Sequence, residues 1–231
     1  MFKLHLILER QWLHALLLVL LLIGVALSSN LDDMGDGALW GISTTQWFWL
    51  AIALAVAHQV FVWFCWRTQL HGRLLDRIFG NLSFSVYAVV FFLLGALRVS
   101  FVFLLAISNR YTLPVNITIL RILAIIALIP AAYLLYSVNR YFSFKRAFGV
   151  DHFDKKYRTL PLVREGIFRF TQNSMYTFGF LFLWVPAFWY ASIAAMCAAL
   201  FNHIYIWVHY YATELPDMKR IYGENQLTNR D

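Results

Sequence analysis

The residues best suited to chemistry lie in two clusters near the end of the 231-residue chain. The first covers residues 164–179 and includes Asn173 and Tyr176, and the second covers residues 214–223 and begins with Glu214. Together they offer a carboxylate, an amide, phenols, a glycine with accessible backbone and nearby arginines. We interpret them as the walls of a polar pocket on top of an apolar bundle.

A window without charged side chains separates the two clusters. It covers residues 170–213, which is 44 residues, whereas one membrane-spanning helix takes about 20. We therefore expect a helical hairpin that turns at Pro186 and has a short first arm, near residues 175–186. Because a hairpin brings its two ends together, the two clusters should meet at one membrane surface.

The rest of the chain supplies further spans. Apolar residues make up 61% and charged residues 13%, against roughly half and about a quarter in soluble domains, so a soluble second domain is excluded. Two cysteines exclude a disulfide scaffold. Further windows without charge cover residues 11–31, 37–66, 78–97 and 122–139.

These windows predict an all-α fold, a polytopic membrane helix bundle with six transmembrane helices, or five as the fallback. The whole chain, 1–231, is expected to form one integral membrane domain. Residues 1–139 would be a four-helix portion, and residues 140–231 a polar loop, the terminal hairpin and a tail that form the functional core. The loop, residues 140–169, is the one sizeable polar segment.

The basic residues are distributed unevenly along the predicted topology. All of the 19 lysines and arginines except Arg98, Arg110 and Arg121 fall on one side, and the positive-inside rule places that side, with both termini, in the cytoplasm. We expect Arg98 and Arg121 to snorkel to the interface. The basic loops then account for the net charge of +7 without a nucleic-acid partner, and no nucleic-acid-binding module is recognisable. The chain is predicted to be a multi-pass protein of a bacterial inner membrane or the endoplasmic reticulum.

The two clusters carry recognisable motifs. Residues 173–176 read Asn-Ser-Met-Tyr, and residues 214–216 read Glu-Leu-Pro ahead of an Ile-Tyr pair. In these runs the chain resembles the integral-membrane methyltransferases that include phosphatidylethanolamine N-methyltransferase and isoprenylcysteine carboxyl methyltransferase, and it is closest to the phospholipid enzymes. Three positions depart from the family pattern: Ser174 replaces a proline, Leu215 replaces a second glutamate, and Gly179 comes one residue later than the family glycine.

The resemblance implies S-adenosylmethionine as methyl donor. Methyl transfer from a sulfonium needs no covalent nucleophile, so the protein has to position two reactants and exclude water. The resemblance implies that Glu214 pairs with the cofactor ammonium, and that Asn173 and the backbone near Gly179 contact its adenosine or methionine part. Tyr176 and Tyr222 would line the pocket, where a ring facing the sulfonium adds a cation–π contact.

The resemblance further implies a lipid acceptor, most simply the amine of a phosphatidylethanolamine-type phospholipid. Its ammonium must lose a proton before it attacks, and Glu214, His209 or a water can receive that proton. Arg164 and Arg169 are placed at a suitable depth to bind a lipid phosphate.

Other functions stay open on the sequence. The acceptor could instead be an isoprenylcysteine carboxylate or a small thiol. A non-catalytic membrane protein that binds lipid or haem is a further alternative, with His58, His203 or His209 as haem ligands. The chain has no Cys-x-x-Cys or His-Glu-x-x-His run, so no metal site is predicted.

Overall fold

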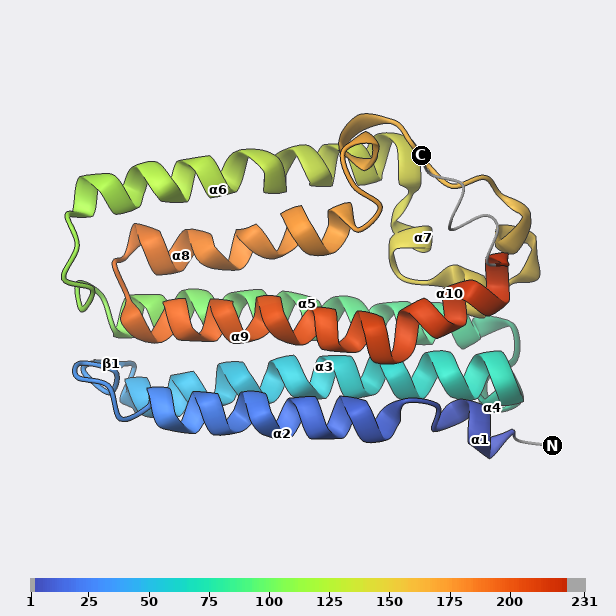
Figure 1. Ribbon diagram of the computed structural model, residues 1–231, viewed down its shortest axis with the longest axis horizontal. Coiled ribbons are helices and arrows are strands. Elements are labelled where there is room, and N and C mark those ends of the chain that lie inside the picture. The colour runs from blue at the N-terminus through green and yellow to red at the C-terminus, as the bar shows by residue number, and fades with distance from the viewer. Residues whose placement is uncertain (1–2, 224–231) are drawn as a thin grey trace.

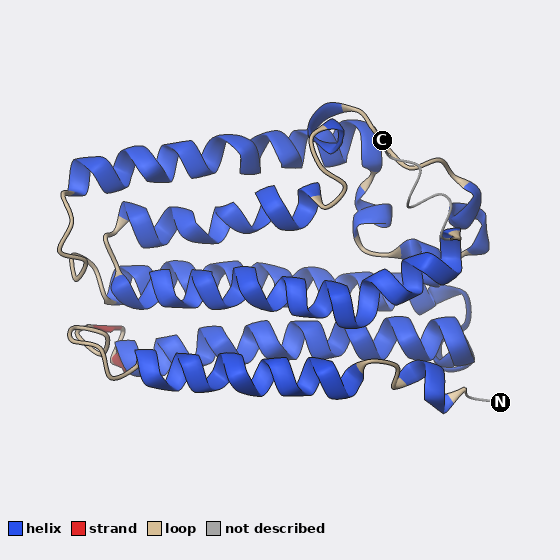
Figure 2. Ribbon diagram, in the orientation of Figure 1, coloured by secondary structure: helices blue, strands red, loops and turns tan. Residues whose placement is uncertain are grey.

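The computed structural model describes residues 3–223, which form a bundle of long, nearly parallel and antiparallel helices (Figure 1). Apart from one short β-hairpin, every regular element of the described part is helical (Figure 2). The elements in chain order are α1 (Leu4–Ile7), α2 (Gln11–Ser28), β1 (Ala38–Leu39), β2 (Ile42–Ser43), α3 (Thr44–Gly72), α4 (Leu74–Phe79), η1 (Gly80–Leu82), α5 (Ser83–Ser108), α6 (Ile117–Ser137), η2 (Val138–Phe142), α7 (Phe144–Ala147), η3 (Val150–His152), η4 (Lys155–Thr159), η5 (Gly166–Arg169), η6 (Met175–Gly179), η7 (Phe180–Leu183), α8 (Trp184–Trp189), α9 (Ile193–His209), η8 (Tyr210–Glu214) and α10 (Leu215–Tyr222). The predicted all-α fold is confirmed.

Five helical segments within residues 3–223 are long and apolar enough to cross a membrane. They are Leu4–Ser28, Thr44–Gly72, Leu74–Ser108, Ile117–Phe142 and Ile193–Tyr222. A sixth apolar segment, Met175–Trp189, is shorter, as expected for the first arm of the hairpin. The structure is therefore that of a polytopic membrane bundle.

The hairpin turns at residues 190–192, so the predicted turn at Pro186 is wrong. Pro186 lies in the first turn of α8, where a missing N–H is tolerated, and the helix continues past it. The actual turn is fixed by the buried Asn109, whose Oδ1 accepts hydrogen bonds from Ser192 Oγ and from the backbone N–H of Ala194, both at 3.0 Å. A side chain from a distant helix end, rather than a proline, sets this turn.

Arg98 does not reach the interface, so its predicted snorkelling is also wrong. Helix α5 runs on to Ser108, which leaves Arg98 inside the bundle with an exposed fraction of 4%. Its Nε donates to Asn202 Oδ1 at 2.5 Å, and its guanidinium lies over the Phe180 ring at 5.0 Å. Arg121 lies near the start of α6 with its guanidinium over a tryptophan ring.

Small side chains let the central helices approach closely. The buried face of α9 carries fully buried alanines, which allow close helix packing in membranes. Helix α9 contacts α2, α3 and α5, and α8 lies between α6 and the α5–α9 pair (Figure 1). These alanines are Ala194, Ala195, Ala198 and Ala199. Because α6 packs mainly on α8, the two arms of the hairpin connect α6 to the central bundle.

The described basic loops gather at one end of the bundle, which we call the basic end. It contains α4, α7, η3 to η5 and α10, whereas the β-hairpin and the turn between α8 and α9 lie at the opposite end (Figure 1). Asp32, Asp33 and Asp36 are on the hairpin side. Arg230, which the sequence assigns to the basic side, lies outside the described residues. The predicted separation of charge thus agrees with the arrangement of the helices.

Gly149 is a position where the fold requires glycine. It has a φ of +78°, and a Cβ there would lie 2.4 Å from the Trp66 indole. Gly149→Ala is expected to lower the free energy of unfolding by at least about 2 kcal/mol, because the cost of the strained backbone and the cost of overpacking against Trp66 add together. Gly41→Ala is the matched control, since Gly41 has a φ of +79° and open space around it. Equal losses in the two variants, measured by unfolding in mixed micelles, would contradict this explanation.

Candidate functional site

A pocket with a volume of about 480 Å³ opens at the basic end of the bundle. This volume lies within the range of about 300–1,000 Å³ typical of sites for small molecules and cofactors. Aromatic, methionine and charged side chains share its wall. The lining residues are Trp66, Phe142, Arg146, Ala147, Gly149, Asp151, His152, Leu162, Val163, Arg164, Phe168, Arg169, Phe170, Thr171, Gln172, Asn173, Met175, Tyr176, Tyr210, Glu214, Leu215, Met218 and Tyr222.

Three π-helical turns border this pocket. The turn η2 contributes Phe142, η6 contributes Met175 and Tyr176, and η8 contributes Tyr210 and Glu214. A π-turn widens the helix by one residue and is frequent at functional sites. Three such turns around one cavity indicate that the backbone is shaped for a ligand here.

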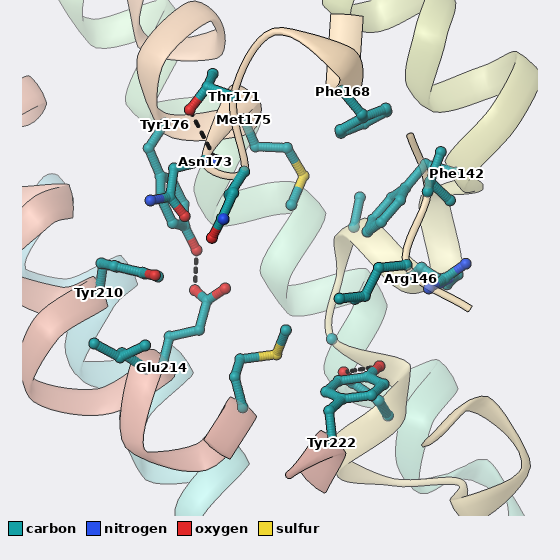
Figure 3. Close-up of a pocket in the computed structure, with 18 of the residues that line it drawn as sticks. Phe142, Arg146, Phe168, Thr171, Asn173, Met175, Tyr176, Tyr210, Glu214 and Tyr222 are labelled. Atoms are coloured by element: carbon teal, nitrogen blue, oxygen red, sulfur yellow. Dashed lines mark hydrogen bonds between the residues drawn. The ribbon is translucent and has the colours of Figure 1, made fainter. Parts of the chain in front are cut away.

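Tyr176 and Glu214 join the two sequence clusters across the pocket. The Tyr176 hydroxyl donates a hydrogen bond to Glu214 Oε2, and the Tyr210 ring lies 5.6 Å from the Tyr176 ring. Figure 3 shows Tyr176, Asn173 and Glu214 directed toward the same space. The hairpin therefore brings together groups that are 38 positions apart.

Two predicted arginines lie at the exposed margin of the pocket. Arg164 and Arg169 both line it and are solvent-exposed, and the Arg169 guanidinium lies 4.7 Å from the Phe170 ring centre. A third arginine, Arg146, lines the pocket with its guanidinium 4.9 Å from the ring centre of Phe142. The pocket mouth is thus positively charged.

Two predicted site residues lie outside the pocket lining. His209 is buried, with its ring 6.0 Å from the ring of His14 and 6.1 Å from that of Trp66, so its helix directs it toward α2 and α3. Gly179 packs against α6, where a Cβ would lie 2.9 Å from Leu134 Cδ2. The structure therefore gives Gly179 a packing contact and separates His209 from the other predicted site residues.

The two family positions with unusual residues are accommodated locally. Ser174 is fully buried, and its single O–H lies within hydrogen-bond distance of the carbonyl oxygens of Ile167, at 3.0 Å, and Thr171, at 2.7 Å. These bonds hold the turn before η6 in place of a proline ring. Leu215, at the position of the second glutamate, lines the pocket as an apolar group.

Asp151 and His152 are pocket residues that the sequence analysis missed. His152 Nδ1 lies 3.1 Å from Asp151 Oδ1, and the Tyr222 hydroxyl donates to Asp151 Oδ2 at 2.8 Å. Burial disfavours the Asp151 carboxylate, but the hydrogen bonds from His152 and Tyr222 outweigh burial and hold the pKa of Asp151 below its ordinary value. The only sequence signal was that both residues lie in the polar segment 140–169.

A buried arginine connects the pocket wall to the amino-terminal helices. Arg67 is fully buried, and its Nε lies 2.8 Å from Asp217 Oδ2. Its other nitrogens donate to the carbonyl oxygens of Thr213, at 3.0 Å, and of Leu6, and Glu9 Oε2 lies 3.6 Å away. Because Thr213 belongs to the π-turn η8, Arg67 binds backbone oxygen in the turn that carries Glu214.

The charge of His152 should make stability depend on pH. Burial disfavours the imidazolium, but the carboxylates of Asp151 and Asp217 outweigh it and raise the pKa of His152 to about 9. The stabilisation by charged His152 is complete at pH values below the pKa of an unfolded histidine, about 6.5. It disappears as the pH rises through the pKa of His152 in the folded protein. We expect the Tm of the wild type in detergent to fall between about pH 7 and pH 10. In His152→Gln the Tm should change much less over this pH range. His5→Gln, at an exposed histidine, should keep the wild-type profile; an unchanged profile in His152→Gln would contradict the assignment.

The histidines considered as haem ligands have separate surroundings. His203 Nδ1 accepts a hydrogen bond from Trp184 Nε1 at 3.1 Å, and the His58 ring lies 4.8 Å from the Phe91 ring. Within residues 3–223 no group of three or more potential ligand side chains could hold a metal ion.

Comparison with known protein families decides what kind of domain contains the pocket. Residues 119–225 match the model of the family described as phospholipid methyltransferase. These residues are thus similar to a phospholipid methyltransferase domain. A search among curated proteins finds no match, and neither does a search among solved structures. The family resemblance carried by the two clusters is thus confirmed.

The residues matched by the family model contain almost the whole pocket. Every lining residue except Trp66 lies between Phe142 and Tyr222, inside the matched range. The family and the five apolar helices support a phospholipid methyltransferase type of function in a multi-pass membrane protein.

Proposed function

We propose that this protein transfers a methyl group from S-adenosylmethionine to the amine of a phosphatidylethanolamine-type phospholipid. The observation that carries the proposal is the hydrogen bond from Tyr176 to Glu214, which unites both family motifs at a pocket of cofactor size. When bound, S-adenosylmethionine supplies a methyl group activated by its sulfonium.

The residues of the pocket fit a cofactor with two positive groups and one negative group. Glu214 offers a carboxylate to an ammonium, and Asn173 offers an amide donor and acceptor. The rings of Tyr176 and Tyr210 lie against each other beside Glu214, and an aromatic face attracts a cation. Arg146 and the rim arginines supply positive charge for a carboxylate or a phosphate.

The same residues fit an amine acceptor. A protonated amine must release its N–H proton before its lone pair can attack carbon, and a carboxylate within hydrogen-bond reach can accept that proton. Glu214 lines the pocket whereas His209 does not, so we assign the proton to Glu214. Arg164 and Arg169 would hold the lipid phosphate at the pocket mouth, while the apolar wall excludes water.

The proposed orientation places the basic end in the cytoplasm. Basic loops favour the cytoplasmic side of a membrane, and a water-soluble methyl donor is available there. In this arrangement residues 140–231 form the methyltransferase core on a four-helix portion that reaches residue 139.

The presence of Glu214 favours an amine over a carboxylate acceptor. A carboxylate acceptor, as in isoprenylcysteine, carries no proton that must be removed and would be repelled by a second carboxylate. Purified protein in mixed-lipid vesicles should move labelled methyl groups from S-adenosylmethionine to phosphatidylethanolamine. It should leave phosphatidylglycerol, a farnesylcysteine and a small thiol unlabelled. Label on farnesylcysteine or on the thiol, or no transfer by folded protein, would overturn the proposal.

A further inference from the structure

The pocket has a second carboxylate, Asp151, at a distance from Glu214. Glu214 and Tyr222, whose hydroxyl bonds to Asp151, are separated by eight positions along η8 and α10, or about 12 Å of helix. Figure 3 shows Tyr222 and Glu214 on different sides of the cavity. The two carboxylates therefore lie in different parts of the cavity.

The Asp151 carboxylate is held in place on several sides. The carboxylate is hydrogen-bonded to His152 and Tyr222. The backbone oxygen of Asp151 accepts a hydrogen bond from Arg158 Nε at 2.8 Å. His152 stacks on Trp66 at 4.3 Å, with an angle of 16° between the rings. These bonds do not use all of the acceptor positions of the carboxylate, so Asp151 can still accept a hydrogen bond from a ligand.

Aromatic side chains lie on the same side of the pocket as Tyr222. The rings of Phe142 and Phe168 stack at 5.0 Å and 27°, and Figure 3 shows both rings above Arg146 and Tyr222. Flat apolar rings are suited to a purine base. A fixed carboxylate in the same pocket is suited to the hydroxyl groups of a ribose, because it can accept their hydrogen bonds.

We propose that Asp151 binds the ribose hydroxyls of the methyl donor, whose base packs against the Phe142–Phe168 pair. This assignment rests on the proposed function, since it takes the ligand to be an adenosine derivative. His152 and Tyr222 act as positioning residues that orient the Asp151 carboxylate. Glu214 then binds the opposite, amino-acid part of the same ligand.

Ligands that lack one group test this division of the pocket. Calorimetry on the full chain in detergent would measure S-adenosylhomocysteine, methylthioadenosine, which lacks the amino-acid part, and the analogue of methylthioadenosine without the ribose hydroxyl next to the base. Removing that hydroxyl should weaken binding to the wild type about 10-fold or more, because a hydrogen bond to a charged group is lost. Asp151→Asn should weaken the binding of methylthioadenosine about 10- to 100-fold. It should also abolish the difference in affinity between methylthioadenosine and its analogue without the hydroxyl.

Two further variants keep the test decisive. Asp154→Asn makes the same change on the same loop at a residue outside the pocket lining, and it should bind all three ligands like the wild type. Asp151→Glu keeps the charge beside His152 if the asparagine variant fails to fold, and should still reduce the discrimination between the nucleosides.

The outcomes separate this inference from the proposed function. If the wild type binds methylthioadenosine and Asp151→Asn or Asp151→Glu discriminates the two nucleosides as well as the wild type does, the ribose assignment is wrong. Loss of phosphatidylethanolamine affinity with unchanged nucleoside binding would also overturn it, since Asp151 would then bind the acceptor. A folded wild type that binds no adenosine derivative would instead contradict the proposed cofactor.

Discussion

Glu214→Gln is expected to lower kcat/KM for phospholipid methylation by at least about 100-fold. The amide keeps the size of the side chain and an oxygen that can accept the Tyr176 hydroxyl, so the pocket should keep its shape. It removes the negative charge for the donor ammonium and the group that accepts the proton of the amine. Methyl transfer to phosphatidylethanolamine in vesicles measures the effect.

Glu165→Gln is the matched control for this prediction. Glu165 belongs to the same cluster as Arg164 but does not line the pocket, and its side chain accepts a hydrogen bond from the backbone N–H of Arg164 at 3.1 Å. Its variant should retain nearly full activity. A Glu214→Gln enzyme with more than about a tenth of wild-type kcat/KM would show that the carboxylate neither binds the donor nor takes the proton.

Arg67→Met is expected to cause the largest loss of stability, about 3–5 kcal/mol. It leaves the fully buried Asp217 without its closest ion-pair partner and removes the donors to the carbonyl oxygens of η8. Because this turn carries Glu214, activity should fall together with stability. Unfolding in mixed micelles and methyl transfer at low temperature measure the two effects.

The exposed arginine at the end of the same helix provides the comparison. Arg73 pairs with Asp76 at 3.0 Å, but its side chain is 79% exposed, and exposed pairs contribute about 0–1 kcal/mol. Arg73→Met should therefore change stability little. Adding Asp217→Leu to Arg67→Met should restore part of the loss, since the buried Asp217 carboxylate is then no longer left without Arg67. Equal losses for Arg67→Met and Arg73→Met would contradict the importance of the buried pair.

The approach of the two clusters could be predicted, because it follows from chain geometry alone. An apolar window of twice the span length has to return to the same membrane surface, and Tyr176 meets Glu214 there. The motifs around these residues also predicted the family, which the match to residues 119–225 confirmed.

Helix boundaries were predicted less well where an arginine was taken as the end of a span. Arg67 and Arg98 lie inside α3 and α5 and are buried. Their partners, Asp217 and Asn202, come from α10 and α9. A charge pattern along the chain contains no information about such tertiary partners, so these arginines resemble the ends of spans.

The remaining part of the site had little or no sequence signal. The π-turns that direct Tyr176 and Glu214 arise from packing and have no characteristic residue pattern. Asp151 and His152 lie in an irregular loop, where no periodicity predicts which side chains face the pocket. Gly179, for which the resemblance implies a backbone contact with the cofactor, packs closely against α6, where a Cβ would lie 2.9 Å from Leu134 Cδ2.

Photolabelling tests most directly whether the methyl donor binds between the two ends of the hairpin. The wild-type protein in vesicles would be irradiated with methyl-tritiated S-adenosylmethionine, with and without excess S-adenosylhomocysteine, and the labelled peptides identified. The proposed function predicts label that the competitor removes, on peptides that contain residues 171–176 or 210–222. Label confined to peptides from the opposite end of the bundle, or no label that the competitor removes, would contradict it.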